Sequence, residues 1–128
     1  PAFMKKDGKP YMSFGLMGGG MQPQGHVQVM INLVDYGMNL QEAGDAARLN
    51  HDGGRQPTDD LAGTGADLLG IPGIPVETVE RLKAMGHKVE VVGNGAMFGG
   101  YQAIVRDPET GVYTGATEMR KDGQAIGY

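Results

Sequence analysis

A run of three glycines at positions 18–20 stands between an apolar strand pattern and an apolar helix pattern. Glycine reaches backbone angles that other residues avoid, and it lets a ligand approach the main chain closely. The amide groups of such a turn, beside the positive end of a helix, can point at an anion. The same residues also suit a plain corner between a strand and a helix. The sequence therefore predicts either an anion-binding turn or a simple change of direction here.

The residues after the glycine run have a helical period. Apolar side chains fall at i, i+3, i+4 and i+7, which predicts a helix over about residues 24–36. Gly37 follows the helix where a left-handed C-cap is expected. The residues with this period are Val27, Met30, Ile31 and Val34.

Two further helices and two hairpins are predicted. Asn39 and Glu42 have the spacing of a capping box, which predicts a helix to about residue 49. Pro75 suits the first position of a third helix, and Gly86 suits its end. Asp-Gly at residues 7–8 and Gly111 are typical hairpin-turn residues. Strand patterns lie at residues 2–6, 10–15, 88–92, 101–106 and 112–117, and residues 50–73 read as loop with one short strand near 68–71.

This order of elements predicts the α+β fold class, because the strands pair in hairpins and the helices come in a block. The 128 residues suffice for a single domain over residues 1–128. Basic residues number 11 against 15 acidic ones, so no basic surface is available for nucleic acid. No apolar run reaches membrane length, and the absence of cysteine excludes disulfides and a cysteine nucleophile. We expect no nucleic-acid and no membrane partner.

Other candidate sites lack the spacing that their chemistry needs. The glycine loop at residues 93–100 leads into a strand, whereas a dinucleotide site leads into a helix. His26, His51 and His87 show no metal-ligand spacing. An N-terminal Pro1 would offer a secondary amine as general base, as in the tautomerase family, but the compact βαβ repeat of that family is absent. We therefore expect no cofactor and no metal.

Several segments resemble the γ-glutamyltransferase family, also called γ-glutamyltranspeptidase, in the family's order and over nearly the whole chain. They are residues 1–10 (PAFMKKDGKP), 14–19 (FGLMGG), 28–43 (QVMINLVDYGMNLQEA), 86–89 (GHKV), 99–104 (GGYQAI) and 115–128 (GATEMRKDGQAIGY). The resemblance implies the C-terminal part of an N-terminal-nucleophile hydrolase with a four-layer αββα sandwich. In that family a precursor cleaves itself and exposes a threonine, which attacks a γ-glutamyl amide such as that of glutathione. The acyl group then passes to water or to an amine.

The resemblance also implies a site. Two adjacent glycines supply the oxyanion hole in the family, and they match Gly18 and Gly19. Met17 stands where the family commonly has proline, and residues 20–24 (GMQPQ) are more similar to its acylase-like branch. The substrate therefore stays open between a γ-glutamyl group and another acyl group, such as a glutaryl or β-lactam side chain. A non-catalytic structural or binding module, with the glycine turn only as a corner, is the other alternative.

The nucleophile is expected outside this chain. The resemblance places the attacking threonine upstream of Pro1. The six threonines of this chain are all internal: Thr58, Thr64, Thr78, Thr110, Thr114 and Thr117. We expect residues 1–128 to be a C-terminal fragment of a small subunit that is inactive alone. Its expected partners are the upstream part of the small subunit, the large subunit of the same precursor and a γ-glutamyl small molecule. Uncovered apolar faces would favour homo-oligomers of the fragment.

Overall fold

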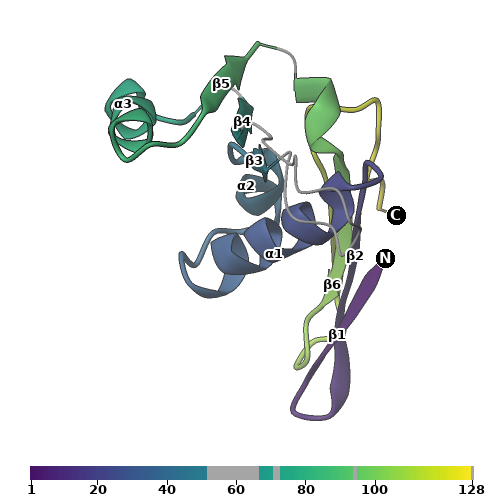
Figure 1. Ribbon diagram of the computed structural model, residues 1–128. Coiled ribbons are helices and arrows are strands. Elements are labelled where there is room, and N and C mark those ends of the chain that lie inside the picture. Colours follow the sequence, from purple (N-terminus) through teal and green to yellow (C-terminus); the bar gives the residue numbers. More distant parts are fainter. Residues whose placement is uncertain (52–66, 71–72, 94, 128) are drawn as a thin grey trace, which may run out of the picture.

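The computed structural model describes residues 1–51, 67–70, 73–93 and 95–127, and it contains two sheets with helices (Figure 1). The larger sheet is antiparallel with the order β1-β2-β6-β7. Its strands are β1 (Ala2–Lys6), β2 (Lys9–Met17), β6 (Gly100–Arg106) and β7 (Tyr113–Thr117). Helices α1 (Met21–Val34) and α2 (Leu40–Asp45) lie on one face of this sheet. Strands in hairpins beside packed helices confirm the α+β class.

Both predicted hairpins are confirmed, and their turns explain why. Asp7 and Gly8 have φ of 51° and 76°, the pair of positive angles that a tight two-residue turn needs. Gly111, with φ of 76°, takes the left-handed position between β6 and β7. The Asp107 carboxylate accepts hydrogen bonds from the amides of Thr110 and Glu109, at 2.7 and 2.9 Å, and these bonds hold the pKa of Asp107 below its usual value.

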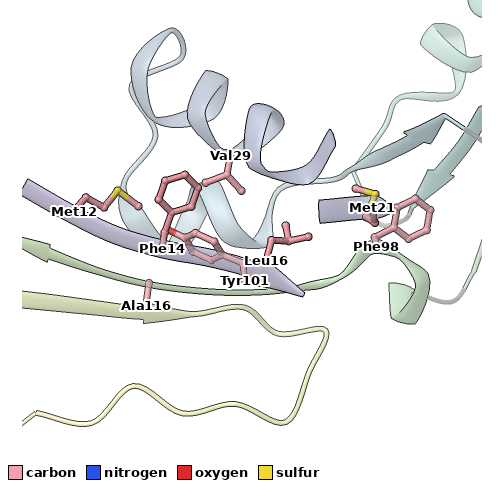
Figure 2. Packing of buried hydrophobic residues seen from close by; sticks show 8 residues of the cluster. All are labelled: Met12, Phe14, Leu16, Met21, Val29, Phe98, Tyr101 and Ala116. Carbon is pink, nitrogen blue, oxygen red and sulfur yellow. The ribbon is translucent and has the colours of Figure 1, made fainter. Parts of the chain in front are cut away.

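The core lies between the larger sheet and α1 (Figure 2). Alternate residues of β2 point into it, and the register places Phe14 opposite Ala103 and Leu16 opposite Tyr101. The helical period is confirmed, but only part of the apolar stripe is buried: Met30 packs against the core, whereas Val27 and Val34 are 58% and 65% exposed. The face that packs on the sheet lies on the opposite side of the helix from Val27 and Val34, and it includes Met21, Gly25 and Val29. Gly25 belongs there because a Cβ at this position would overlap the Leu16 side chain.

Helix α2 begins as predicted and ends earlier. The Asn39 side chain accepts from the amides of Gln41 and Glu42, and the Glu42 carboxylate accepts from the Asn39 amide, which completes the capping box. The helix stops at Asp45, whereas the sequence suggested about residue 49. The backbone turns extended at Ala46 (φ −52°, ψ 147°). Two arginine side chains, described below, bind the carbonyls that a longer helix would have used.

The smaller sheet has the order β3-β4-β5 and packs near α3. Its elements are β3 (Leu49–His51), β4 (Asp67–Gly70), β5 (Val89–Val92) and α3 (Val76–Ala84). The prediction of one short strand within residues 50–73 is therefore incomplete, since β3 begins at Leu49 and pairs with β4. Residues 52–66 and 71–72, where that loop prediction also falls, lie outside the described residues.

Two glutamines of α1 bind the edge of β3 that faces away from β4, as a neighbouring strand would. The Gln28 side chain accepts from the Leu49 amide and donates to the Leu49 carbonyl, both at 2.8 Å. The Gln24 side chain accepts from the His51 amide at 2.7 Å and donates to the His51 carbonyl at 3.0 Å. Because the two glutamines are four residues apart, they project from the same side of α1. This contact joins the helix to the smaller sheet and covers the edge of β3 opposite β4.

None of the described helices covers the other face of the larger sheet. A cavity of about 790 Å³ lies there, lined among others by Pro1, Ser13, Gln102, Tyr113 and Ala125. The chain after β7 crosses this face, where Ala125 packs over Gly115. Among the described helices, none has the length and apolar character needed to cross a membrane.

Candidate functional site

The glycine turn connects β2 to α1 and is open to solvent. Gly18 and Gly19 have φ of 133° and 56°, angles that favour glycine, and both residues are exposed. Their carbonyls accept from the amides of Met21 and Gln22, at 3.0 and 3.1 Å, and so begin the helix. Within the described part of the chain, neither the Gly18 amide nor the Gly19 amide donates a hydrogen bond. Two adjacent N–H groups are thus available beside the N-terminus of α1.

A second glycine turn supports the first one from behind. Gly99, with φ of 81°, packs so tightly that a Cβ would overlap both Leu16 and the Met17 carbonyl. A Cβ on Gly18 would lie 3.2 Å from the Gly99 Cα atom. The predicted glycine loop at residues 93–100 therefore has a structural place: it contains the 3₁₀ helix η1 (Gly95–Phe98) and brings Gly99 against the back of the exposed turn.

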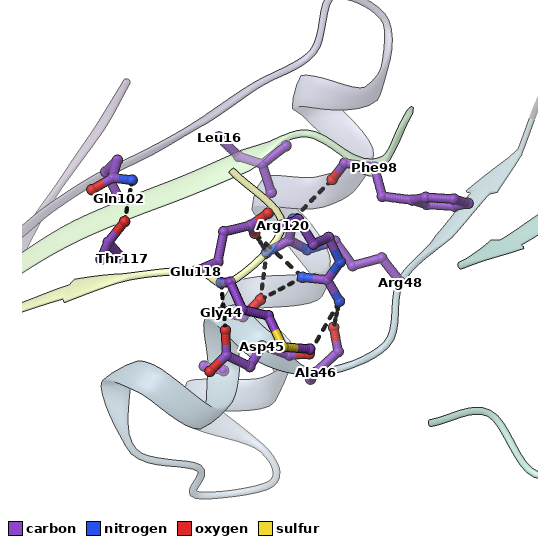
Figure 3. A network of polar contacts seen from close by, with 12 residues as sticks. Leu16, Gly44, Asp45, Ala46, Arg48, Phe98, Gln102, Thr117, Glu118 and Arg120 are labelled. Atoms are coloured by element: carbon purple, nitrogen blue, oxygen red, sulfur yellow. Dashed lines mark hydrogen bonds and ion pairs between the residues drawn. The ribbon is translucent and has the colours of Figure 1, made fainter. Parts of the chain in front are cut away.

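A buried ion network anchors the backbone next to Gly99 (Figure 3). Arg48 and Glu118 are each 1% exposed and form an ion pair, and Arg120 reaches the same carboxylate at 3.4 Å. Arg48 donates to the Phe98 carbonyl and to the Gly44 carbonyl, both at 2.8 Å. Phe98 directly precedes Gly99, so this network fixes the segment that supports the glycine turn.

Arg120 completes the network from the chain after β7. Its guanidinium donates to the carbonyls of Gly44, Asp45 and Ala46, at 2.9, 3.0 and 2.6 Å. These are the carbonyls at the end of α2, where a cation also interacts favourably with the helix dipole. Burial lowers the pKa of the Arg48 guanidinium from its ordinary value, and the Glu118 charge opposes that shift. The network thus holds α2, η1 and the end of β7 together.

Tyr101 lies fully buried beside this network, and its hydroxyl has no hydrogen-bond partner among the described residues. Gly44 leaves room for the ring, because a Cβ on Gly44 would overlap it. Burial raises the pKa of the Tyr101 phenol above its ordinary value of 10.0, and the Arg48 charge only partly opposes this. Tyr101 therefore stays neutral in the folded protein at alkaline pH.

This shift predicts how stability depends on pH. The folded protein keeps a proton on Tyr101 that the unfolded chain loses above about pH 10. The free energy of unfolding is therefore not reduced by this group below that pH, and it decreases above it. The fall approaches about 1.4 kcal/mol per pH unit. We expect Tyr101→Phe to reduce this dependence, as measured by urea denaturation at about pH 9 and about pH 11. An equal loss of stability in wild type and variant would contradict the prediction.

The structure places only some of the candidate residues from the sequence near one another. Gly18 and Gly19 occupy the exposed turn that the sequence predicted. His26 contacts the strand that leads into this turn, whereas His51 lies on β3 and His87 follows α3. Arg48, Glu118 and Arg120 were not singled out from the sequence. An arginine directly after the small apolar residues 46–47 was the one available signal for a buried charge.

Comparisons with known proteins give a consistent result. The whole chain, residues 1–128, matches the family model described as gamma-glutamyltranspeptidase. The glutathione hydrolase-like YwrD proenzyme of Bacillus subtilis (strain 168) is 34% identical over 128 residues, which make up 99% of this chain and 23% of that protein. The crystal structure of cephalosporin acylase from Bacillus halodurans matches with 43% identity and a TM-score of 0.79, and the match covers 98% of this chain and 22% of that one.

A more distant structure shares the fold. The gamma-glutamyltranspeptidase from Pseudomonas nitroreducens complexed with L-DON matches with a TM-score of 0.80 at 23% identity, over 100% of this chain and 61% of that one. The chain spans about a fifth of the length of the curated proenzymes that it matches.

Proposed function

Because the chain belongs to the gamma-glutamyltranspeptidase family, we propose that it supplies the oxyanion hole of an amide hydrolase or acyltransferase that acts through an acyl-enzyme. The chain has the fold of the N-terminal-nucleophile hydrolases in this family. The observation that supports the proposal is the pair of adjacent amides, Gly18 and Gly19, which are exposed and donate to no described residue.

Amide hydrolysis through an acyl-enzyme requires hydrogen-bond donors of this kind. Attack on an amide carbonyl places a negative charge on the carbonyl oxygen, and amides already aimed at that oxygen stabilise the charge without reorganising. Loss of one donor typically costs about 2.7–4 kcal/mol of barrier lowering. Gly18 and Gly19 have positive φ in this turn. Gly99 lies close behind Gly18, and Arg48 binds the carbonyl of the adjacent Phe98, so both contacts support this backbone conformation.

The attacking group comes from outside this chain in our proposal. Residues 1–128 form one domain, the C-terminal part of a small subunit, and a threonine of the same precursor attacks the amide. The upstream part of the small subunit and the large subunit are its partners. The isolated chain is catalytically inactive, since the oxyanion amides alone provide no nucleophile. The exposed apolar side of α1, which includes Val27 and Val34, favours self-association of the isolated chain.

Two substrate classes follow from the relatives. The name of the Bacillus subtilis relative points to glutathione, a γ-glutamyl amide, and that of the Bacillus halodurans relative to a cephalosporin side chain. The acylase class is favoured by residues 20–24, which are more similar to the acylase-like branch. A γ-glutamyl substrate stays the second candidate.

A direct assay tests the proposal. The 128-residue chain and the full-length proenzyme that contains it are purified separately and incubated with γ-glutamyl-p-nitroanilide and with a glutaryl amide. We expect the full-length protein to hydrolyse one of the two substrates and the isolated chain to show no turnover above background. Equal rates for the two preparations would contradict the proposed role, and so would a correctly processed full-length protein without amide hydrolase activity.

A further inference from the structure

Strand β2 extends beyond its partner β1 just before the glycine turn. The β1–β2 register ends where Ala2 pairs with Phe14, whereas the β2–β6 register continues to Met17 and Gly100. Leu16 therefore lies past the end of the described β1 ladder. A buried amide at such a place needs another acceptor, because an unpaired N–H group is costly to bury.

Helix α1 supplies this acceptor. The Leu16 amide donates to the Nε2 atom of His26 at 3.3 Å, and the Leu16 side chain is buried. The imidazole ring also packs edge-on against Phe14, with the ring centroids 5.3 Å apart. His26 lies in the second turn of α1, so its contact with β2 spans the glycine turn from the helix side to the strand side.

The contact closes a loop of about ten residues that contains both proposed oxyanion amides. Leu16 precedes Gly18 by two residues, and the peptide between them sets the direction of the Gly18 N–H group. On the opposite side of α1, Gln24 and Gln28 fix the helix to β3. The helix is therefore held to one strand on each side, and the turn between β2 and α1 has little freedom to rotate.

We propose that His26 is a positioning residue of the oxyanion turn. It accepts the Leu16 amide through an unprotonated Nε2 atom and thereby fixes the angle between β2 and α1 at which the Gly18 and Gly19 amides point outward. The inference rests on the proposed function of those two amides. The role requires an acceptor at the position of Nε2, so an imidazole protonated on both nitrogens cannot fulfil it.

Three variants of the full-length enzyme test the proposal. His26→Gln keeps an acceptor atom at the same bond distance from Cβ. His26→Asn places its acceptor one bond too close to the helix. His26→Phe keeps the ring against Phe14 but offers no acceptor. We expect kcat to fall about 10- to 100-fold in the Phe and Asn variants, because displacement of a positioned group by about 1 Å costs this much.

The pattern of kinetic constants separates positioning from a general structural role. KM should change by less than about twofold, since oxyanion donors act mainly in the transition state. His26→Gln should keep kcat within about threefold of wild type. Hydrogen exchange of the Leu16 amide gives a readout that does not depend on activity: exchange should be faster in the Phe and Asn variants and near wild type in the Gln variant. Should the Phe variant not fold, the Asn and Gln variants provide the same comparison.

The outcomes distinguish this inference from the proposed function. If Gly18→Ala lowers kcat and His26→Phe does not, the oxyanion role stands and the positioning role of His26 is wrong. If neither variant affects kcat, the oxyanion role itself is wrong, and the inference fails with it. Unchanged exchange at Leu16 in the Phe variant would also overturn the inference.

Discussion

Gly18→Ala in the full-length enzyme is expected to lower kcat about 100- to 1,000-fold, the loss typical for one oxyanion donor. An alanine is strained at φ of 133°, and its Cβ would lie 3.2 Å from the Gly99 Cα atom and 3.3 Å from the Met21 Cβ atom. Gly99 cannot move away, because its own backbone is packed against Leu16 and Met17. The Gly18 peptide must therefore rotate, and its N–H group leaves the position that the transition state needs.

Alanine substitutions at the two following glycines, Gly19 and Gly20, are controls for which we expect smaller effects. Gly19 has φ of 56°, and a Cβ added to it would meet no atom within 4 Å, so Gly19→Ala carries only the left-handed backbone penalty of roughly 1–2 kcal/mol. Gly20 has helical angles, φ −62° and ψ −18°, and equal space around it. Gly20→Ala should therefore keep kcat within about twofold of wild type.

Steady-state kinetics on the three variants check this order. Autoprocessing is monitored by gel, so that only correctly cleaved enzyme is compared. KM should stay nearly constant, because the donors interact more strongly with the transition state than with the substrate. Equal effects of Gly18→Ala and Gly20→Ala would mean that the turn is only a corner between β2 and α1, which was the alternative that the sequence left open.

The sequence predicted best where short-range backbone chemistry decides the structure. Asp7-Gly8, Gly111 and the Asn39–Glu42 capping box are local signals, and all three formed the expected turns and cap. The glycine turn at Gly18 is also local, so its place between strand and helix could be recognised. Its proposed role as an anion site depended on the family resemblance, because a glycine turn alone is compatible with a plain corner.

The helical period did not identify the packed face of α1, because a distant segment determines it. The apolar stripe through Val27 and Val34 has a proper helical period, but α1 is apolar on more than one side and packs through Met21, Gly25 and Val29. Periodicity cannot choose between two apolar faces. The small residue Gly25 decides, because it lets Leu16 approach the helix.

The buried ion network could not be predicted from local sequence patterns, for the same reason. Arg48 and Glu118 are 70 residues apart in the sequence, and nothing in either segment alone indicates the other. The early end of α2 is a consequence of this network, since Arg48 and Arg120 take the carbonyls of Gly44, Asp45 and Ala46. Helix propensity favoured a longer helix, and tertiary contacts overrode it.

The second large effect is expected for Glu118→Gln, which should reduce the free energy of unfolding by about 3–5 kcal/mol. The carboxylate is the buried anion that pairs with both Arg48 and Arg120, and the side chains of all three residues are at most 4% exposed. A glutamine of the same shape leaves two buried guanidinium groups without a counter-charge. Removing one partner of a buried ion pair lowers the free energy of unfolding strongly, because the other charge stays buried without a partner. Replacing the whole pair by apolar residues changes stability much less.

The same substitution at an exposed ion pair is the matched control. Glu80 pairs with Lys83 at 3.2 Å, and these side chains are 63% and 46% exposed, so Glu80→Gln should change stability by less than about 0.5 kcal/mol. Urea denaturation of both variants gives the two values. A double variant, Arg48→Met with Glu118→Leu, should lose less than the sum of its single variants, because it removes both charges of one pair together. Additive losses, or similar effects of Glu118→Gln and Glu80→Gln, would show that burial does not determine how much the network contributes to the free energy of unfolding.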